Sequence, residues 1–258
     1  MDALFNTRNL SVGYGNTTII DRLNLCIATG EVTTLIGPNG CGKSTLLKAM
    51  SALLGHTGTL EFLGRPLEQW GRKERARALT LLPQSPVAPG GLTVAQLISR
   101  GRHPYQNWLA QWSDQDSDVV NHAMEITGVG HLASRQLADL SGGQRQRVWI
   151  AMAIAQDTPA LLLDEPTTFL DLATSVDVLR LVRELCDTQG RSVVMVLHDL
   201  NLAGRFSDRL ILLNAEGSVA ASGKPEDVLT EELLREVFSL DAIVVKDPVS
   251  GGPLVLPR

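Results

Sequence analysis

Residues 37–45 carry the strongest chemical pattern in this chain, G-x-x-x-x-G-K-S/T. Glycines at this spacing let the backbone wrap a phosphate with its N–H groups turned inward. The lysine places a positive charge at the β- and γ-phosphates, and the serine hydroxyl can ligate Mg²⁺. The stretch predicts a nucleotide-phosphate site formed by Gly37, Pro38, Asn39, Gly40, Cys41, Gly42, Lys43, Ser44 and Thr45.

This loop needs a strand before it and a helix after it. Residues 31–36 have the apolar character of a buried strand, and residues 45–50 that of a helix whose N-terminus would face the phosphates. The alternative is a glycine-rich turn that precedes Lys-Ser by chance, and the flanking elements disfavour it.

Two adjacent carboxylates, Asp164 and Glu165, follow an apolar run at residues 160–163. Such a run is typical of a buried central strand. Asp164 at the strand end can hold Mg²⁺ through water, and Glu165 can polarise a water molecule for attack on a γ-phosphate. Because two buried acids are costly without a cation nearby, we expect this pair to be functional.

A histidine, His198, ends another apolar run at residues 192–197. At the carboxyl end of a strand it would lie where open α/β sheets bind their ligands. The alternative is a histidine at the edge of the core that is bonded to backbone. The residues alone leave both interpretations open.

A second possible anion site is Ser141-Gly142-Gly143-Gln144, which opens a helical run at residues 145–156. A hydroxyl, bare backbone amides and the helix dipole would converge there. The alternative is an ordinary serine N-cap with flexible glycines. Tyr14, in a turn ahead of the phosphate loop, could stack on a nucleotide base or pack on a sheet edge.

The whole chain has 258 residues, a net charge of −5 and a pI of about 5.5. This length allows one or two domains, and the lack of a basic excess argues against a nucleic-acid partner. No apolar run approaches the roughly 18–20 residues that span a bilayer, and no secretory signal is expected at the N-terminus. Scattered cysteines predict a reducing compartment: Cys26, Cys41 and Cys186.

The remaining pattern indicates β structure near the N-terminus and helices in the middle of the chain. A Pro/Gly-rich break after Gln84 predicts a subdomain boundary. We further expect β structure over 4–30, a solvated basic helix face at 72–77, helices capped by Thr93 and Ser113 and a helix at 172–189. Residues 103–112 are either a loop anchored by aromatics or a partner-facing surface. From residue 224 we expect a short acidic helix and then an extended segment at 247–254.

In this order the motifs resemble those of the ATP-binding subunit of ABC transporters over essentially the whole length. The phosphate loop looks like Walker A, and Leu140-Ser141-Gly142-Gly143-Gln144 matches the signature motif letter for letter. The resemblance implies catalytic roles for Glu165, His198 and Lys43. It places Ser44, Gln84 and Asp164 at Mg²⁺, and Tyr14, Gln84, Ser141, Gly142, Gly143, Gln144 and Asp171 at ATP, beside the phosphate loop.

The resemblance also implies an α/β P-loop NTPase fold. A RecA-like core with an antiparallel β subdomain would comprise residues 1–84 and 150–223, a helical subdomain 85–149, and a tail 224–258. Members of the family form head-to-tail dimers that sandwich two ATP molecules and drive a membrane permease. The chain would then be a peripheral protein on the cytoplasmic face of a bacterial inner membrane.

Three stretches resemble the subgroup that imports ferric siderophores: residues 100–105, 166–171 and 247–254, and the last of them looks like the close of the ferric-enterobactin type. Such importers receive their cargo from an extracytoplasmic binding protein. Many of them place His-Gln where this chain has Thr174-Ser175, so the siderophore itself stays open. The alternatives are a haem or cobalamin importer, a non-transport ABC ATPase, and an inactive nucleotide-binding module, which the presence of Glu165 and His198 disfavours.

Overall fold

A computed structural model of the chain describes residues 2–106, 112–168 and 170–258. Its centre is a six-stranded sheet in which β9, β3, β8, β7 and β6 run parallel and β10 pairs antiparallel at one edge. In sheet order the strands are β10 (Val219–Gly223), β9 (Arg209–Leu213), β3 (Val32–Ile36), β8 (Ser192–Val196), β7 (Ala160–Asp164) and β6 (Leu79–Leu82).

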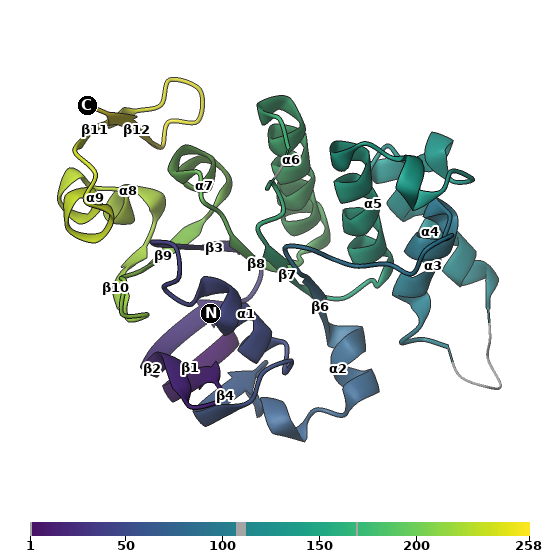
Figure 1. Cartoon of the computed structure of the whole chain (residues 1–258), viewed down its shortest axis with the longest axis horizontal. Helices are drawn as coiled ribbons and strands as arrows, with labels where there is room; N and C mark the ends of the chain where they lie inside the picture. Colours follow the sequence, from purple (N-terminus) through teal and green to yellow (C-terminus); the bar gives the residue numbers. More distant parts are fainter. Residues whose placement is uncertain (1, 107–111, 169) are drawn as a thin grey trace.

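A second, antiparallel sheet covers one face of the central sheet together with helix α1 (Lys43–Met50) (Figure 1). Its strands are β2 (Thr17–Ala28), β1 (Ala3–Tyr14), β4 (His56–Phe62) and β5 (Arg65–Pro66), in that order. Alternate residues of the central strands face opposite sides, so Leu35 and Leu162 pack toward α1 while Ile36 and Leu163 pack toward the other helices. Burial on both faces explains why β7, β8 and β9 are almost wholly apolar.

The other face of the central sheet is covered by α5, α6 and α7, and α3 and α4 pack beside α5 (Figure 1). The helices are α2 (Arg72–Ala78), α3 (Val94–Ser99), α4 (Asp114–Ile126), α5 (Gly142–Ala155), α6 (Leu172–Gln189), α7 (Leu200–Phe206), α8 (Pro225–Val228) and α9 (Glu231–Phe238). Short 3₁₀ turns occur at Leu67–Gln69, Arg100–Arg102, Gly130–Leu132 and Leu137–Asp139. No helix in the part of the chain that the structure describes is long and apolar enough to cross a membrane.

Most of the expected elements are confirmed, including the helix at 172–189 with its bounds unchanged. Thr93 and Ser113 cap α3 and α4, each accepting a hydrogen bond from the backbone N–H three residues later. The expected division between residues 149 and 150 falls inside α5, which begins at Gly142 and runs unbroken to Ala155. One continuous helix therefore crosses the boundary that was expected between the helical subdomain and the core.

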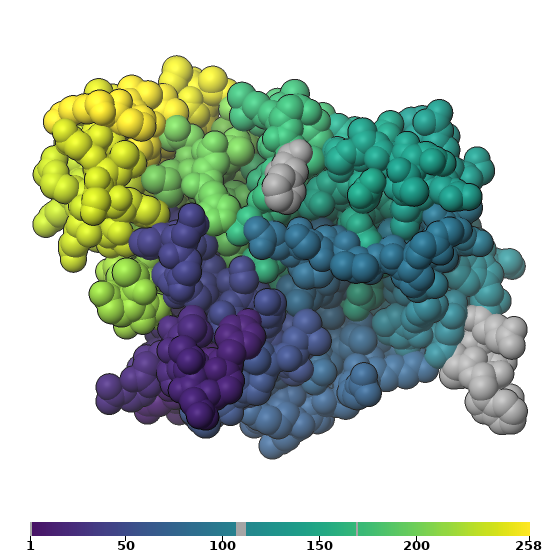
Figure 2. Space-filling model, viewed as in Figure 1, coloured from purple at the N-terminus to yellow at the C-terminus, as the bar shows by residue number. Residues whose placement is uncertain are grey.

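The tail differs from the expectation of one short helix and an extended segment. It folds into α8, α9 and a hairpin of β11 (Ala242–Lys246) and β12 (Pro253–Pro257). The run Ile243-Val244-Val245 is rich in β-branched residues, which favour strands. Figure 2 shows the tail in yellow and the N-terminal sheet in purple at one end of the molecule, with the helical part in teal at the other.

The basic run at 72–77 forms α2, and every residue of it is exposed or half-buried, as expected for a solvated face. Two of its side chains also donate hydrogen bonds to the aromatic stretch. Lys73 Nζ bonds the Gln106 carbonyl at 2.5 Å, and Arg77 Nε bonds the Pro104 carbonyl at 2.9 Å. The expectation for residues 103–112 lies partly outside the described residues, because 107–111 are not among them.

A buried ion pair fixes the start of this stretch to the rest of the helical part. Arg102 and Asp116 are 4% and 6% exposed, and Arg102 Nε lies 2.8 Å from Asp116 Oδ1. Arg102 also donates to the Ala155 carbonyl at the end of α5 and stacks on Tyr105. Burial acts to raise the pKa of Asp116, but hydrogen bonds from Arg102 and Ser113 outweigh it and hold the pKa below its ordinary value.

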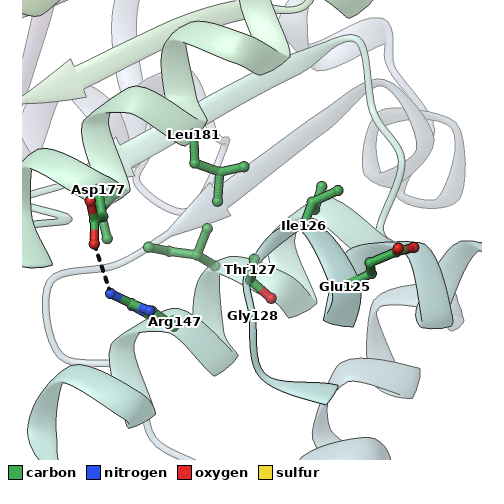
Figure 3. A pocket seen from close by; sticks show the side chains of 9 residues that line it. Glu125, Ile126, Thr127, Gly128, Arg147, Asp177 and Leu181 are labelled. Carbon is green, nitrogen blue, oxygen red and sulfur yellow. Dashed lines mark hydrogen bonds and ion pairs between the residues drawn. The ribbon is translucent and has the colours of Figure 1, made fainter. Parts of the chain in front are cut away.

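An exposed ion pair of the same kind offers a matched comparison. Arg147 of α5 and Asp177 of α6 both line a cavity of about 210 Å³ and contact each other there, with Nη2 and Oδ2 3.1 Å apart (Figure 3). Their side chains are 35% and 54% exposed. An exposed pair of this kind stabilises a fold by only about 0–1 kcal/mol.

Arg102→Leu should therefore lower the free energy of unfolding by about 3–5 kcal/mol, because it leaves Asp116 buried without its partner. Arg147→Leu should lower it by less than about 1 kcal/mol. Urea denaturation measures both. Since the folded pKa of Asp116 is lowered, the pair contributes fully above the ordinary aspartate pKa and loses its contribution as the pH falls toward the folded value. Equal losses in the two variants would contradict the assignment.

Candidate functional site

The phosphate loop connects β3 to α1 at the carboxyl edge of the central sheet. Lys43 is 5% exposed, and its ammonium donates to the carbonyls of Gly37 and Pro38, each at 2.8 Å. The lysine thus already points into the loop that would wrap a phosphate. A cavity of about 430 Å³ opens above it.

A turn distant in sequence supports this loop from beneath. Gly217 lies in the turn between β9 and β10 with a φ of +77°, and a Cβ there would stand 2.7 Å from the Ile19 carbonyl oxygen and 3.1 Å from that of Cys41. Only a residue without a side chain fits so close to two backbone segments. The turn therefore holds the underside of the phosphate loop against β2.

Asp164 lies at the end of β7, directly behind the loop. Its carboxylate is buried and accepts a hydrogen bond of 2.8 Å from the Ser44 hydroxyl. Burial raises the pKa of Asp164, and the neighbouring Glu165 raises it further, while the Ser44 hydrogen bond lowers it. A nearby positive charge would stabilise the ionised form of a carboxylate that is buried in this way.

Glu165 is the centre of a hydrogen-bonded cluster. Its Oε1 lies 2.6 Å from His198 Nε2, and its Oε2 accepts from Gln84 Nε2 at 2.6 Å and from Thr168 Oγ1 at 2.7 Å. Burial acts to raise the pKa of Glu165, but the bonds from Thr168, His198 and Gln84 outweigh it, so the pKa lies below its ordinary value. The carboxylate is therefore kept ionised and oriented.

The backbone of Glu165 is itself unusual, with a φ of +51°. A non-glycine residue in this region costs of order 1–3 kcal/mol, and such strain clusters at functional sites. The left-handed conformation makes an abrupt turn directly after the buried Asp164. It directs the two neighbouring acids to different partners, Ser44 for one and His198 for the other.

The structure brings most of the expected residues to the one cavity, whose described lining includes Gln84, Glu165 and His198. Tyr14 lies at its rim, 47% exposed, with Lys48 Nζ 3.5 Å from its hydroxyl. The remaining lining comes from Ile19 and from residues 39, 40 and 42–45 of the loop. His198 contacts a carboxylate, so the alternative of a backbone-bonded core histidine is wrong.

Two expected parts of the nucleotide site, residues 141–144 and Asp171, are not among the described residues that line this cavity. Ser141 caps α5, where its hydroxyl accepts from the Gln144 N–H and the Gln144 side chain accepts from the Ser141 N–H. Asp171 caps α6 by accepting from the N–H and the hydroxyl of Thr174. Neither lines the cavity with Lys43, so each would need a second chain to meet a nucleotide.

Sequence reasoning missed Thr168. Its hydroxyl holds Glu165, and its own backbone N–H donates to the Glu165 carbonyl at 3.2 Å. A hydroxyl three residues after a strand-end acid is a weak signal, because serine and threonine are common in turns.

The sequence and the fold of this chain are similar to those of known proteins. Residues 20–168 match the profile of a family described as ABC transporter. A petrobactin import ATP-binding protein of Bacillus anthracis, FpuD, is 48% identical over 259 residues, which cover 100% of this chain and 94% of that protein.

Two further comparisons agree with these matches. The ferric enterobactin transport ATP-binding protein of Escherichia coli, FepC, is 44% identical over 249 residues, with 96% of this chain and 92% of that protein covered. Among solved structures, an inward-facing transporter of the metal-chelate type has a chain that superimposes with a TM-score of 0.84 at 29% identity. The superposition covers 100% of this chain and 98% of that one.

Proposed function

Since this chain belongs to the ABC transporter family and is one of its ATP hydrolases, we propose that it powers the import of a ferric siderophore across a bacterial inner membrane. The observation that carries ATP hydrolysis is the cluster of Glu165, Gln84 and His198 at the cavity that Lys43 and Ser44 also line, and the cargo class rests on the relatives. A site of this composition can bind a nucleoside triphosphate and activate water against it.

In the proposed mechanism the loop amides and Lys43 hold the β- and γ-phosphates, and Tyr14 stacks on the adenine. Glu165, ionised and fixed by three side chains, accepts a hydrogen bond from the attacking water. The water oxygen bonds the γ-phosphorus as the bond to the ADP oxygen breaks, and the proton that the water loses passes to Glu165, which yields ADP and phosphate. His198 stays on Glu165 Oε1 and orients the carboxylate.

The residues behind the loop fit a magnesium ion. Asp164 offers a buried carboxylate with a raised pKa, and Ser44 and Gln84 offer further oxygen atoms. Mg²⁺ prefers oxygen ligands, and it is usually bound by one or two protein groups together with the substrate phosphates. When bound, it would neutralise charge that builds up between the β- and γ-phosphates.

The proposal includes a second copy of the chain. Ser141 and Asp171 do not line the cavity of their own chain, and among the described residues the N–H groups of Gly142 and Gly143 at the start of α5 have no acceptor, so they could bind an anion. A head-to-tail dimer would bring this end of α5, with the Gln144 side chain, to the γ-phosphate on the partner subunit. ATP binding would close the dimer and hydrolysis would open it.

The dimer would move a permease embedded in the inner membrane, with this chain bound at its cytoplasmic face. The cargo would reach that permease from an extracytoplasmic siderophore-binding protein. One relative is named for petrobactin and another for ferric enterobactin, and the two are similarly identical to this chain. We therefore propose the class of cargo and leave the individual siderophore open. Haem or cobalamin is the second candidate cargo.

Deletion of the gene should abolish uptake of one radiolabelled ferric siderophore in iron-starved cells and leave other iron routes intact. A chromosomal Lys43→Ala change should behave like the deletion, because the loop then lacks its phosphate-binding charge. An Arg147→Leu strain serves as the control and should keep normal uptake. Normal uptake of every siderophore together with lost uptake of haem or cobalamin would move the cargo to that second class.

A further inference from the structure

The hairpin of β11 and β12 packs against α7, the helix that begins two residues after His198 (Figure 1). Pro253 and Val255 are buried on its inner face, and Val255 shares a hydrophobic cluster with Ala203 of α7. The hairpin is therefore an integral part of the core, although the proposed function assigns it no role.

One side chain joins the two elements. Asn201 Oδ1 accepts from the Val255 N–H at 2.7 Å, and Asn201 Nδ2 donates to the Val255 carbonyl at 3.1 Å. An amide can accept and donate at once, so a single side chain pairs both backbone groups of one residue. Asn201 thus occupies the outer edge of β12 as a neighbouring strand would.

Close packing continues one turn further along α7. A Cβ at Gly204 would stand 2.9 Å from Leu229 Cδ1 and 3.3 Å from the Pro253 carbonyl oxygen. Because Gly204 has no side chain, β12 and α8 can lie directly on the helix. Helix α7 is therefore fixed at two successive turns by the tail.

The N-terminal end of α7 connects directly to the nucleotide site. Asp199 caps α7 by accepting from the N–H groups of Asn201 and Leu202, each at 2.9 Å. His198 immediately precedes it and contacts Glu165. Helix α7 has only seven residues, so the surfaces it packs on determine its position.

We propose that Asn201 is a positioning residue: through its two bonds to β12 it sets the first turn of α7 and thereby holds His198 against Glu165. The proposal rests on the role assigned above to His198. It gives the tail hairpin a function in ATP hydrolysis, although the hairpin lines none of the described nucleotide cavity.

Asn201→Ala in the full-length chain should lower kcat for ATP hydrolysis about ten-fold and leave KM within about two-fold. A misplacement of about 1 Å at a reacting centre can cost up to roughly 10²-fold, whereas the phosphate loop is untouched. Asn24→Ala is the matched control. Asn24 also accepts from one backbone N–H and donates to one carbonyl, but in the antiparallel sheet, and its removal should leave kcat unchanged.

The decisive measurement is a double-mutant cycle with His198→Ala. If Asn201 acts through His198, adding Asn201→Ala to His198→Ala should cause no further fall in kcat. A full ten-fold fall in that background would overturn the proposal, and so would a kcat for Asn201→Ala equal to that of Asn24→Ala. Wild-type kcat in His198→Ala alone would instead overturn the role proposed for His198.

Asn201→Asp keeps the test valid if Asn201→Ala does not fold. A carboxylate still accepts from the Val255 N–H, but it repels the Val255 carbonyl oxygen. We expect kcat to fall with KM unchanged and the fall to vanish in the His198→Ala background. Wild-type kcat in a folded Asn201→Asp chain would overturn the proposal.

Discussion

Glu165→Gln should lower the rate of ATP hydrolysis by about 10²–10⁴-fold, the factor typical of a positioned acid or base, and leave ATP affinity within a few-fold of wild type. Glutamine has the shape of glutamate and keeps one acceptor oxygen, but it carries no negative charge to polarise the water and cannot accept its proton. It also cannot accept at its amide nitrogen, so at least one of the bonds from His198, Gln84 and Thr168 is lost.

Single-turnover hydrolysis and fluorescent-nucleotide binding measure the two quantities separately. The variant should accumulate an ATP-bound dimer, which gel filtration detects. Glu184→Gln on the exposed side of α6 is the control, because it removes a carboxylate far from the site with no change in either quantity. Hydrolysis by Glu165→Gln within a few-fold of wild type would mean that another group activates the water.

Mixing two inactive chains should restore activity. Lys43→Ala removes the phosphate-binding charge of the loop, and Ser141→Arg places a bulky side chain at the start of α5 without touching the cavity of its own chain. In a mixed dimer one site carries both defects and the other carries neither. Random pairing gives about half mixed dimers with one intact site of two, so the mixture should recover about a quarter of wild-type activity.

Each variant alone should hydrolyse ATP at background rate, and Ser141→Arg should still bind ATP on its own loop. The control replaces Ser141→Arg with Glu165→Gln. There the mixed dimer keeps an intact Lys43 only in the site that lacks Glu165, so no activity returns. No recovery in the Lys43→Ala and Ser141→Arg mixture would contradict sites shared between chains.

The sequence predicted the nucleotide cavity well because parallel strands end at one edge. Lys43, Glu165 and His198 follow three different strands, and their strand-end positions alone imply that they meet. The turn of Glu165 into the left-handed region and the bond from Thr168 were not predictable. Both depend on how the loop after β7 packs, which carries no periodic signal.

The tail was the largest error in the predicted fold. A run as short as Ile243-Val244-Val245 fits a strand only if a partner strand is found, and that partner, β12, lies beyond a Pro/Gly-rich turn. The glycines at 142 and 143 weaken helix propensity, yet the Ser141 cap starts α5 there.

The turn that carries Gly217 looks like a connection free to change in length and sequence, as surface hairpin turns usually are. Gly217 nevertheless lies close to two carbonyls, that of Ile19 in β2 and that of Cys41 in the phosphate loop. An insertion or a tag placed there would displace the loop without touching any nucleotide contact. The nucleotide site therefore limits which sequences this turn can have, although the turn contributes none of the residues that would bind the nucleotide.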